Sequence, residues 1–390
     1  MKILQVCPIF PPQPSNFASG VTQVVYHMSN ELVKRQHKVE VWAANTLDMK
    51  TKIQSEVALV DGIEVHYFPY IMHYYTFFLS PSLIQAARSK LDEFDVIHIH
   101  DFRTFQGLVV AHYARKKNVP YLLQAYGSLP RMMAMQKLKR VYDTLWGYRL
   151  LRGASKVIAV TKTEAEQYKS MSVGEDKIEI IPNGVDLSEF QNLPERGQFR
   201  KKYGLDNKQK LILYLGRIHK IKSPDLLVKS FAELTKKFHD VKLAIVGPDD
   251  GYLPVLKKVI DDLGINDRIL LTGPLYGREK LAAYVDADVY VLPSVYDMSP
   301  STVMEACACA TPVVVTSSCG LANWIEGYQA GYVVPHDKKQ LQQALATILT
   351  DEKLRQKLAS QARRLVEEQF AWNKIVDQIE ATYKAVIRNV

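Results

Sequence analysis

Residues 292–315 have the sequence LPSVYDMSPSTVMEACACATPVVV, and the rest of the chain can be placed around this stretch. A buried strand from Val289 leads into it, and after a turn through Asp297 we expect a helix to begin at Ser299 or Pro300. Serine suits the helix cap because its hydroxyl accepts an amide hydrogen bond, and proline suits the first helical position, where no donor is needed. The stretch therefore predicts a strand, a polar turn and a well-marked helix N-terminus.

The first turn of this helix is predicted to bind an anion. The amides of Ser301, Thr302 and Val303 would have no acceptor within the helix, and they lie at the positive end of the helix dipole. Glu305 follows about one turn later on the same face, where a carboxylate can accept both hydroxyls of a ribose. Asp297 would face the other end of a diphosphate. We interpret the stretch as a site for a nucleotide diphosphate sugar.

Asp297 and Glu305 enclose seven residues, and PSVYD-x7-EACACATPVV resembles the acid-x7-acid signature of retaining glycosyltransferase family 4. The resemblance implies an α/β protein of the GT-B fold. That fold has two Rossmann-like domains facing a central cleft and a C-terminal helix that crosses back to the first domain. The family usually has glutamate where this chain has Asp297. Taken alone, the stretch has a structural alternative, an ordinary capped helix with Glu305 in solvent.

Length and composition are those of a folded globular protein. The chain has 390 residues, enough for two or three domains, and 47% of them are hydrophobic and 23% charged. No run reaches the roughly 18 uninterrupted apolar residues of a membrane span. The start, MKILQVCPIF, is expected to be a buried strand rather than a signal peptide. Four cysteines without a C-x-x-C pair predict free thiols and a cytoplasmic location.

The first half alternates short apolar segments with segments of helical periodicity, which is typical of a parallel sheet with helices on both faces. We expect strands over 1–6, 38–43, 63–68, 96–100 and 120–124, and helices over 21–35, 81–91 and 108–117. This pattern predicts a Rossmann-like domain over residues 1–185, to which the resemblance assigns acceptor binding. The loop before Gly20 leads into a helix and resembles the family's Gly-Gly loop, so Gly20 is expected to contact the donor.

Polar residues follow two strands of this domain. The strand DVIHIH places His98 and His100 on one face and ends at Asp101, at the edge of the sheet where ligands bind. Tyr126 follows the next strand, where the family commonly has a histidine that contacts the donor sugar or the acceptor. His100, Asp101 and Tyr126 are therefore candidates for the acceptor side. Two histidines without a third ligand do not predict a metal site.

The second half repeats the alternation. Residues 179–190, EIIPNGVDLSEF, resemble the family's crossing between domains. We expect a Rossmann-like domain that binds the nucleotide sugar over residues 186–370, and a C-terminal helix over 371–390 that returns to the first domain. Asp286 and Asp288 precede a strand and are interpreted as structural.

The strand LILYL ends at Gly216 and is followed by Arg217 and Lys222, which resembles the family's GR-x4-K element. Arginine offers a planar fork of donors and lysine a compact charge, so the pair would stabilise the negative charge that builds on a leaving diphosphate. No divalent metal or other cofactor is then required. The resemblance adds two donor-binding residues that follow later strands, Gly247 and Leu275.

The net charge of +9 is concentrated in one segment, because residues 101–157 hold eleven Lys and Arg against two Asp. Within it, residues 131–152 form an expected amphipathic helix with a basic face that includes Lys137, Lys139 and Arg140. Such a helix could contact an anionic membrane, on the inner face of the plasma membrane, or pack on its own domain with its charges in water. Both interpretations stay open.

These observations predict a retaining glycosyltransferase that takes a sugar from a UDP- or GDP-linked donor, without a metal, to a glycan or lipid-linked acceptor. Arg217 and Lys222 would hold the diphosphate with the amides of Ser301 and Thr302, while Asp297 orients the sugar. One alternative is a GT-B nucleotide-sugar 2-epimerase. Another is a basic nucleic-acid-binding protein, against which the sequence lacks RRM, KH and helix-turn-helix patterns.

Overall fold

The computed structural model describes residues 1–13, 20–48, 50–131 and 135–388. They form two compact units, each with its own core. Unit 1 comprises Met1–Gly184 together with Trp372–Val390, and unit 2 comprises Val185–Ala371. The boundaries predicted from the sequence, after residues 185 and 370, lie one residue away from these. In the described parts of the chain, no helix is both long and apolar enough to span a bilayer.

Unit 1 is built on an eight-stranded sheet with the order β10-β9-β8-β7-β1-β2-β4-β3. Its strands are β1 (Lys2–Ile9), β2 (Lys38–Ala44), β3 (Val57–Val60), β4 (Ile63–Phe68), β7 (Val96–His100), β8 (Tyr121–Gln124), β9 (Lys156–Ala159) and β10 (Ile178–Ile180). All neighbouring pairs are parallel except β3 with β4. The chain order reverses between β1 and β7, and ligands bind at such a switch point in open α/β sheets.

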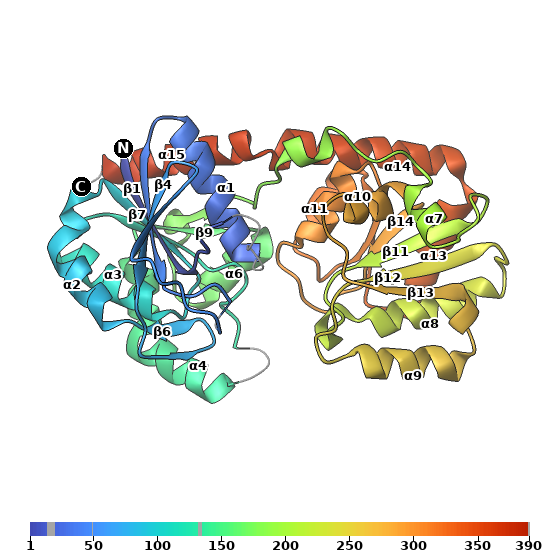
Figure 1. Ribbon diagram of the computed structural model, residues 1–390, viewed down its shortest axis with the longest axis horizontal. Coiled ribbons are helices and arrows are strands. Elements are labelled where there is room, and N and C mark those ends of the chain that lie inside the picture. The colour runs from blue at the N-terminus through green and yellow to red at the C-terminus, as the bar shows by residue number, and fades with distance from the viewer. Residues whose placement is uncertain (14–19, 49, 132–134, 389–390) are drawn as a thin grey trace. The chain divides into compact units, whose positions relative to one another are not determined.

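Helices cover both faces of this sheet. They are α1 (Gly20–Lys34), α2 (Pro81–Lys90), α3 (Phe105–Lys116), α4 (Gln136–Tyr142), α5 (Tyr148–Gly153), α6 (Lys162–Ser170) and α15 (Trp372–Ile387). Residues of α1 and α15 share one core with the sheet, and residues of α2, α3, α5 and α6 share the other. Figure 1 shows α15 beside α1, so the C-terminal helix belongs to unit 1 as the GT-B resemblance implies.

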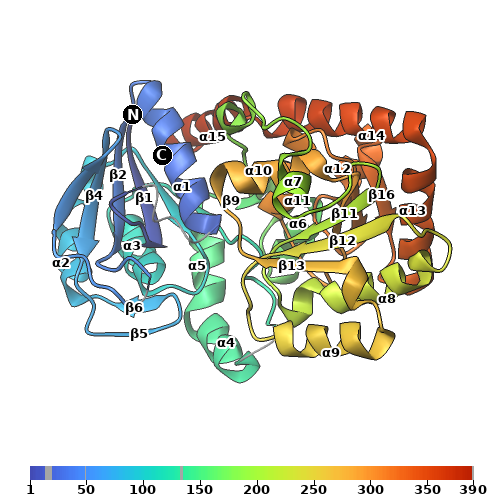
Figure 2. The same cartoon turned by 45° about the vertical axis from the view of Figure 1, so that its right-hand side comes forward.

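A short hairpin of β5 (Met72–Tyr74) and β6 (Phe77–Leu79) stands apart from the main sheet of unit 1 (Figure 2). This hairpin is not predicted from the sequence. Its strands have only three residues each, and β5 is exposed along its whole length. β5 therefore has no buried alternation that could be recognised in the sequence, and β6 is too short to show one.

The single amphipathic helix predicted over residues 131–152 begins later, at Gln136, and contains a π-helical turn. Residues 132–134 lie outside the described residues, and the remainder forms α4, a π-helical turn (Asp143–Gly147) and α5. The carboxylate of Asp143 is buried inside this turn and accepts hydrogen bonds from Arg103 Nε at 2.9 Å and Arg131 Nε at 2.7 Å. A buried charge must be paired, and these bonds hold the π-helical turn inside a helical segment that is continuous from Gln136 to Gly153.

Unit 2 is built on a six-stranded parallel sheet with the order β13-β12-β11-β14-β15-β16. Its strands are β11 (Lys210–Leu215), β12 (Val241–Val246), β13 (Ile269–Gly273), β14 (Val289–Leu292), β15 (Val313–Thr316) and β16 (Gly331–Val334). The first three strands run outward from β11, and the chain then returns to β14 on its other side. The switch point of unit 2 therefore lies between β11 and β14, where a dinucleotide or nucleotide fold binds its ligand.

The helices of unit 2 are α7 (Gln198–Lys202), α8 (Pro224–Thr235), α9 (Leu253–Leu263), α10 (Gly277–Asp286), α11 (Ser301–Ala308), α12 (Ala322–Tyr328), α13 (Lys338–Thr350) and α14 (Glu352–Leu365). Figure 1 shows α8 and α9 on one face of the sheet and α10, α11 and α14 on the other. Helices on both faces explain why the strands are apolar throughout rather than alternating.

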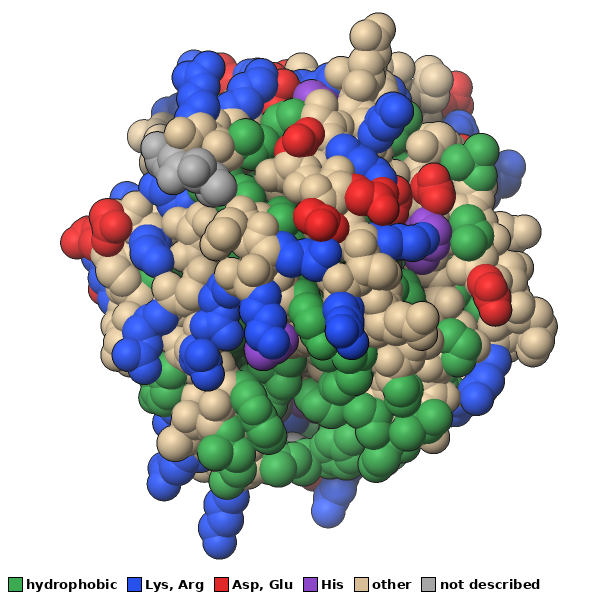
Figure 3. Space-filling model, turned by 90° about the vertical axis from the view of Figure 1, so that its left-hand side faces the viewer, with side chains coloured by type: hydrophobic (Ala, Val, Ile, Leu, Met, Phe, Trp, Pro, Cys, Tyr) green, Lys and Arg blue, Asp and Glu red, His purple; other side chains and the backbone are tan. Residues whose placement is uncertain are grey.

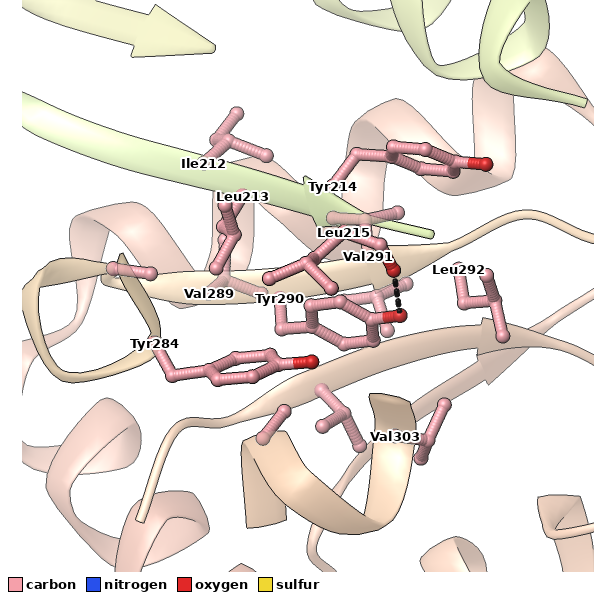
Figure 4. Packing of buried hydrophobic residues seen from close by; sticks show 14 of the residues in the cluster. Ile212, Leu213, Tyr214, Leu215, Tyr284, Val289, Tyr290, Val291, Leu292 and Val303 are labelled. Carbon is pink, nitrogen blue, oxygen red and sulfur yellow. Dashed lines mark hydrogen bonds between the residues drawn. The ribbon is translucent and has the colours of Figure 1, made fainter. Parts of the chain in front are cut away.

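Two tyrosines place their hydroxyl groups inside the apolar core of unit 2 (Figure 4). Tyr284 of α10 and Tyr290 of β14 are fully buried. The Tyr290 hydroxyl donates to the Leu215 carbonyl oxygen, at the end of β11, at 3.0 Å. A buried hydroxyl without a partner costs about 1 to 3 kcal/mol, so this bond ties the ends of the two central strands together.

Asp286 and Asp288 are structural, as interpreted from the sequence. Asp286 Oδ2 accepts the amide of Arg200 at 2.9 Å, and Asp288 Oδ2 accepts the amide of Leu211 at 2.8 Å. The Arg200 guanidinium pairs with Asp288 at 3.2 Å, with both side chains almost fully buried. Although they form an Asp-x-Asp sequence, these carboxylates bind protein groups inside unit 2.

Candidate active site

The loops that follow β11, β14 and β15 are joined by backbone hydrogen bonds at one edge of unit 2. The amide of Val295 donates to the Ile221 carbonyl at 2.8 Å, and the amide of Gly320 donates to the Asp297 carbonyl at 2.7 Å. These bonds hold the loop that carries Lys222 against the loop that carries Asp297. The site is therefore built at the switch point of the sheet.

Lys222 and Asp297, both predicted to act in catalysis, form an ion pair with each other. Their side chains are only 16% and 13% exposed, so the pair is shielded from solvent. Lys222 ends a 3₁₀ turn, and the following Ser223 has a left-handed φ of 49°. Glycine adopts that backbone most easily, so Ser223 holds a conformation that few residues with a side chain adopt.

Arg217 lies at the same edge of the unit 2 sheet but does not join the ion pair of Lys222 and Asp297. Its guanidinium pairs with Asp250, in the loop after β12, and its side chain is 60% exposed. Its carbonyl accepts a hydrogen bond from the Tyr214 hydroxyl at 2.8 Å. The structure thus brings Lys222 and Asp297 together but shows Arg217 with Asp250, a partner that the sequence analysis does not single out.

The ends of β11, β12 and β13 approach each other closely at glycines. Gly247 has φ of 149°, and a Cβ there would overlap the carbonyl group of Gly216. Its amide donates to the carbonyl of Gly273 at 3.0 Å. Leu275 follows β13 and its side chain is buried in the core of unit 2, so only its backbone is available for the predicted contact with the donor.

The helix α11 begins one residue later than expected. Its N-cap is Pro300, so the prediction of Ser299 as the cap is wrong. The amide of Val303 donates to the Pro300 carbonyl at 3.2 Å, which removes Val303 from the predicted free amides. Ser301 and Thr302 remain at the open first turn, where the amides of a helix lack acceptors within it.

A core tyrosine holds the first turn of α11. The Tyr290 hydroxyl and Thr302 Oγ1 are 2.7 Å apart. A phenol has one proton, which Tyr290 gives to Leu215, so Thr302 donates to the tyrosine oxygen. Sequence reasoning missed this role of Tyr290 because a buried aromatic in an apolar strand looks like ordinary core.

Glu305 is held by α10. The Tyr284 hydroxyl donates to Glu305 Oε2 at 3.0 Å, and Lys280 Nζ lies 3.0 Å from Oε1. The carboxylate is 17% exposed, so the structural alternative with Glu305 in solvent is wrong. An ionised carboxylate has about four acceptor positions, and the two unused ones can still accept hydroxyls. Lys280 and Tyr284 are four residues apart, which puts both on one face of α10. This spacing was the one feature of the sequence that could have indicated a shared partner such as Glu305.

At the edge of unit 1, the loop predicted to receive the donor is mostly outside the described residues, since 14–19 are among those not described. Gly20 is the first residue of α1 and has open space around it. Its expected contact with the donor therefore stays a prediction.

His100 lies beneath the edge rather than on it. Its side chain is fully buried, and both ring nitrogens have partners: Nδ1 is 2.7 Å from the Tyr126 hydroxyl and Nε2 is 2.6 Å from Gln5 Oε1. Because Gln5 Oε1 can only accept, Nε2 carries the proton and Tyr126 donates to Nδ1. His100 is thus placed to orient Tyr126 rather than to contact an acceptor itself.

The chain of hydrogen bonds continues to the C-terminal helix. Gln5 Nε2 donates to the Tyr383 hydroxyl at 3.2 Å, and Tyr383 donates to His98 Nδ1 at 2.8 Å. Burial lowers the pKa of His98 to about 3. Burial, together with the nearby His98, also lowers the pKa of His100 well below its usual range. Both histidines are therefore neutral near pH 7.

Tyr126 and Gly127 are held in left-handed conformations, with φ of 54° and 80°. The buried carboxylate of Glu164 accepts the amide of Gly127 at 2.5 Å and that of Val160 at 2.7 Å. Burial raises the pKa of Glu164 to about 7. Asp101 begins the neighbouring loop and accepts the Thr76 hydroxyl at 3.2 Å. Sequence reasoning missed Glu164, which positions the loop that carries Tyr126.

Two family descriptions match most of this sequence. "Glycosyltransferase Family 4" matches residues 18–189, and "Glycosyl transferases group 1" matches residues 195–365. The chain belongs to glycosyltransferase family 4. It is a glycosyltransferase of the GT-B type, as the acid-x7-acid stretch and the order of the strands predict.

Relatives of this family 4 enzyme extend over nearly its whole length. An uncharacterized glycosyltransferase of Methanocaldococcus jannaschii is 27% identical and covers 98% of both chains. A D-inositol 3-phosphate glycosyltransferase of Kineococcus radiotolerans is 24% identical over 95% of this chain and 92% of its own. The structure of HepE from Anabaena in complex with UDP has a TM-score of 0.80 at 18% identity, covering 99% of this chain and all of that one. That likeness supports the fold.

Proposed function

We propose that this family 4 enzyme transfers a sugar from a nucleotide diphosphate sugar with retention of anomeric configuration, and that unit 2 binds the donor. The observation that carries the proposal is the shielded ion pair of Lys222 with Asp297 at the switch point, next to the open first turn of α11. A cation and free amides at the carboxyl ends of parallel strands form a site for a diphosphate.

Each side chain then has a distinct role. The diphosphate competes with Asp297 for Lys222 and accepts the amides of Ser301 and Thr302. Arg217 exchanges its exposed partner Asp250 for a phosphate oxygen. Once released, Asp297 accepts hydroxyls of the donor sugar.

The remaining donor contact is made by Glu305. Tyr284 and Lys280 fix its carboxylate and leave acceptor positions for the two hydroxyls of a ribose. Both partners come from α10, whereas Glu305 itself lies on α11 about one turn after Ser301 and Thr302, so one helix carries the ribose contact and the amides of the diphosphate site.

Retention is proposed to occur by attack on the same face from which the diphosphate leaves. As the sugar–oxygen bond breaks, the leaving phosphate oxygen takes the proton of the acceptor hydroxyl. Burial raises the pKa of Tyr126 well above its usual value, and His100 has both nitrogens occupied, so neither is suited to act as a base near neutral pH. Lys222 and Arg217 neutralise the departing charge, and no divalent metal is required.

The donor base is proposed to be uracil, with guanine as the second choice, because the similar HepE structure contains UDP. The acceptor is proposed to be a glycan or a lipid-linked precursor, bound by unit 1 at the edge that carries Asp101 and Tyr126.

Thermal unfolding with a panel of nucleotides tests the donor site. With EDTA present, saturating UDP is expected to raise the unfolding temperature by about 5 °C, because a ligand that binds only the folded state stabilises it by mass action. GDP, ADP and CDP serve as comparisons, and a shift with GDP alone would reassign the base. If no nucleotide raises the midpoint, with EDTA or with magnesium, the proposed donor site is wrong.

We also propose that the surface around α4 contacts anionic membrane. Leu138 and Val141 are 53% and 52% exposed. Lys137 and Arg140 lie on the same short helix and are exposed beside them. Exposed apolar residues bordered by cations are typical of a helix that lies at a membrane interface.

Sedimentation with vesicles tests this contact. The enzyme is expected to sediment with phosphatidylglycerol-rich vesicles at low salt and to stay in solution with neutral vesicles. Charge reversal of Lys137 and Arg140 to glutamate should reduce sedimentation, while the same change at Lys257 and Lys258 of α9 should not. Equal sedimentation of the two variants would contradict a contact through α4.

A further inference from the structure

A groove with a volume of about 430 Å³ lies on unit 1, lined by residues of α2, α3, the π-helical turn and α5. This volume falls in the range of sites for small ligands. None of the residues proposed to bind donor or acceptor lines it. The residues that matter below are Ile84, Leu108, Leu145, Trp146, Arg115 and Arg149.

The apolar side chains of the groove are unusually exposed. Leu145, Trp146 and Ile84 have 57%, 48% and 40% of their surface in solvent. Figure 3 shows an apolar band below a group of Lys and Arg side chains on this side of the molecule. Single exposed apolar residues are common, but a contiguous group that lines a groove marks a binding surface.

The charged side chains of the groove all have one sign. Its lining includes Arg115 and Arg149 and no carboxylate. Among the described residues neither arginine has an ion pair, and Arg115 Nε is buried without a hydrogen-bond partner. His112 also lines the groove, and its pKa is lowered by burial and then by the surrounding cations, among them Arg115 and Arg149. The groove therefore presents a positive field with no counter-charge of its own.

We infer that this groove binds the hydrocarbon chain of an anionic membrane lipid, with the lipid phosphate between Arg115 and Arg149. The apolar lining excludes a fully hydrated anion such as free phosphate, and the arginines select against neutral amphiphiles and basic peptides. Along α3, the groove extends from Leu108 to Arg115, which is about 10 Å at 1.5 Å per residue. This length suits a hydrocarbon chain that lies along the helix with the lipid phosphate at Arg115.

This inference rests on the part of the proposed function that brings unit 1 to a membrane. It adds a defined lipid site to a general surface contact. It does not depend on donor binding in unit 2, so the two can fail separately.

Binding of dodecyl phosphate to the full-length enzyme, below its micelle concentration, tests the groove. We expect saturable binding with a blue shift of tryptophan emission that is lost in Trp146→Phe. Arg149→Glu should weaken binding roughly tenfold to a hundredfold, because a charge-assisted hydrogen bond to the phosphate is lost and a repulsive charge is added. Arg152→Glu, on the same helix but outside the groove, is the matched control and should bind as the unmodified enzyme does.

Two comparison ligands test the apolar lining and the arginines of the groove separately. Inorganic phosphate and dodecyl maltoside should each bind far more weakly than dodecyl phosphate, because each satisfies only one half of the groove. Equal binding of the maltoside would overturn selection by the arginines, and equal effects of Arg149→Glu and Arg152→Glu would overturn the location. The UDP-induced shift of unfolding temperature should be unchanged in both variants, so a loss of that shift reports on the donor site instead.

Discussion

Lys222→Ala is expected to lower kcat by a factor of about 10² to 10³, because the variant loses a preorganised positive charge at the departing diphosphate. The lysine is largely shielded from water, so its charge is weakly screened and acts strongly on the developing negative charge. The effect should fall mainly on kcat, with a smaller rise in the KM for the donor. Steady-state kinetics with the nucleotide sugar identified by thermal unfolding provides the measurement.

The matched control is Lys220→Ala, two residues away in the same 3₁₀ turn, where the side chain is exposed. Its activity should be nearly unchanged. Since Lys222→Ala also leaves Asp297 without its partner, the double variant Lys222→Ala/Asp297→Asn checks whether any loss of stability comes from the unpaired carboxylate. A Lys222→Ala enzyme that is folded and turns over at a near-normal rate would refute the assigned role.

The strands of the fold were predictable because parallel strands covered on both faces are apolar along their length. The predicted strand before the acid-x7-acid stretch is β14, and the predicted strand LILYL is β11. Short or exposed strands were not predictable, and β5 of the hairpin carries no buried position from which periodicity could be recognised. The π-helical turn that begins at the buried Asp143 was not predictable either, because apolar spacing does not distinguish such a turn from α-helix.

The candidate site was predictable as a set of residues but not as a set of contacts. Lys222 and Asp297 lie 75 positions apart, and only the return of the chain to the other side of β11 makes them neighbours. Periodicity placed His98 and His100 on one face of β7, yet the partner of His98 is Tyr383, 285 positions away. Partners from distant segments depend on strand order and helix docking, which local spacing does not encode.

The second large effect is expected at Gly247. Gly247→Ala should lower the free energy of unfolding of unit 2 by about 3 to 5 kcal/mol. The added methyl group would lie 1.9 Å from the Gly216 carbonyl oxygen, and backbone cannot yield as the end of a flexible side chain can. The ends of β11 and β12 would separate, and with them the loop that carries Arg217 and Lys222 from the loop that carries Asp250. Hydrogen exchange in peptides of β11 and β12, read by mass spectrometry, reports this unit alone.

Gly251→Ala is the matched control for that change. Gly251 has φ of 81°, so an alanine there is strained in the same sense, but nothing lies within 4 Å of its added carbon. It should cost only about 1 kcal/mol, the usual penalty of the left-handed region. If the two variants lose protection equally, the close approach of Gly247 to Gly216 is not what requires glycine. If Gly247→Ala loses much more protection than Gly251→Ala, the close approach of Gly247 to Gly216 is what shapes the donor site in the ligand-free enzyme.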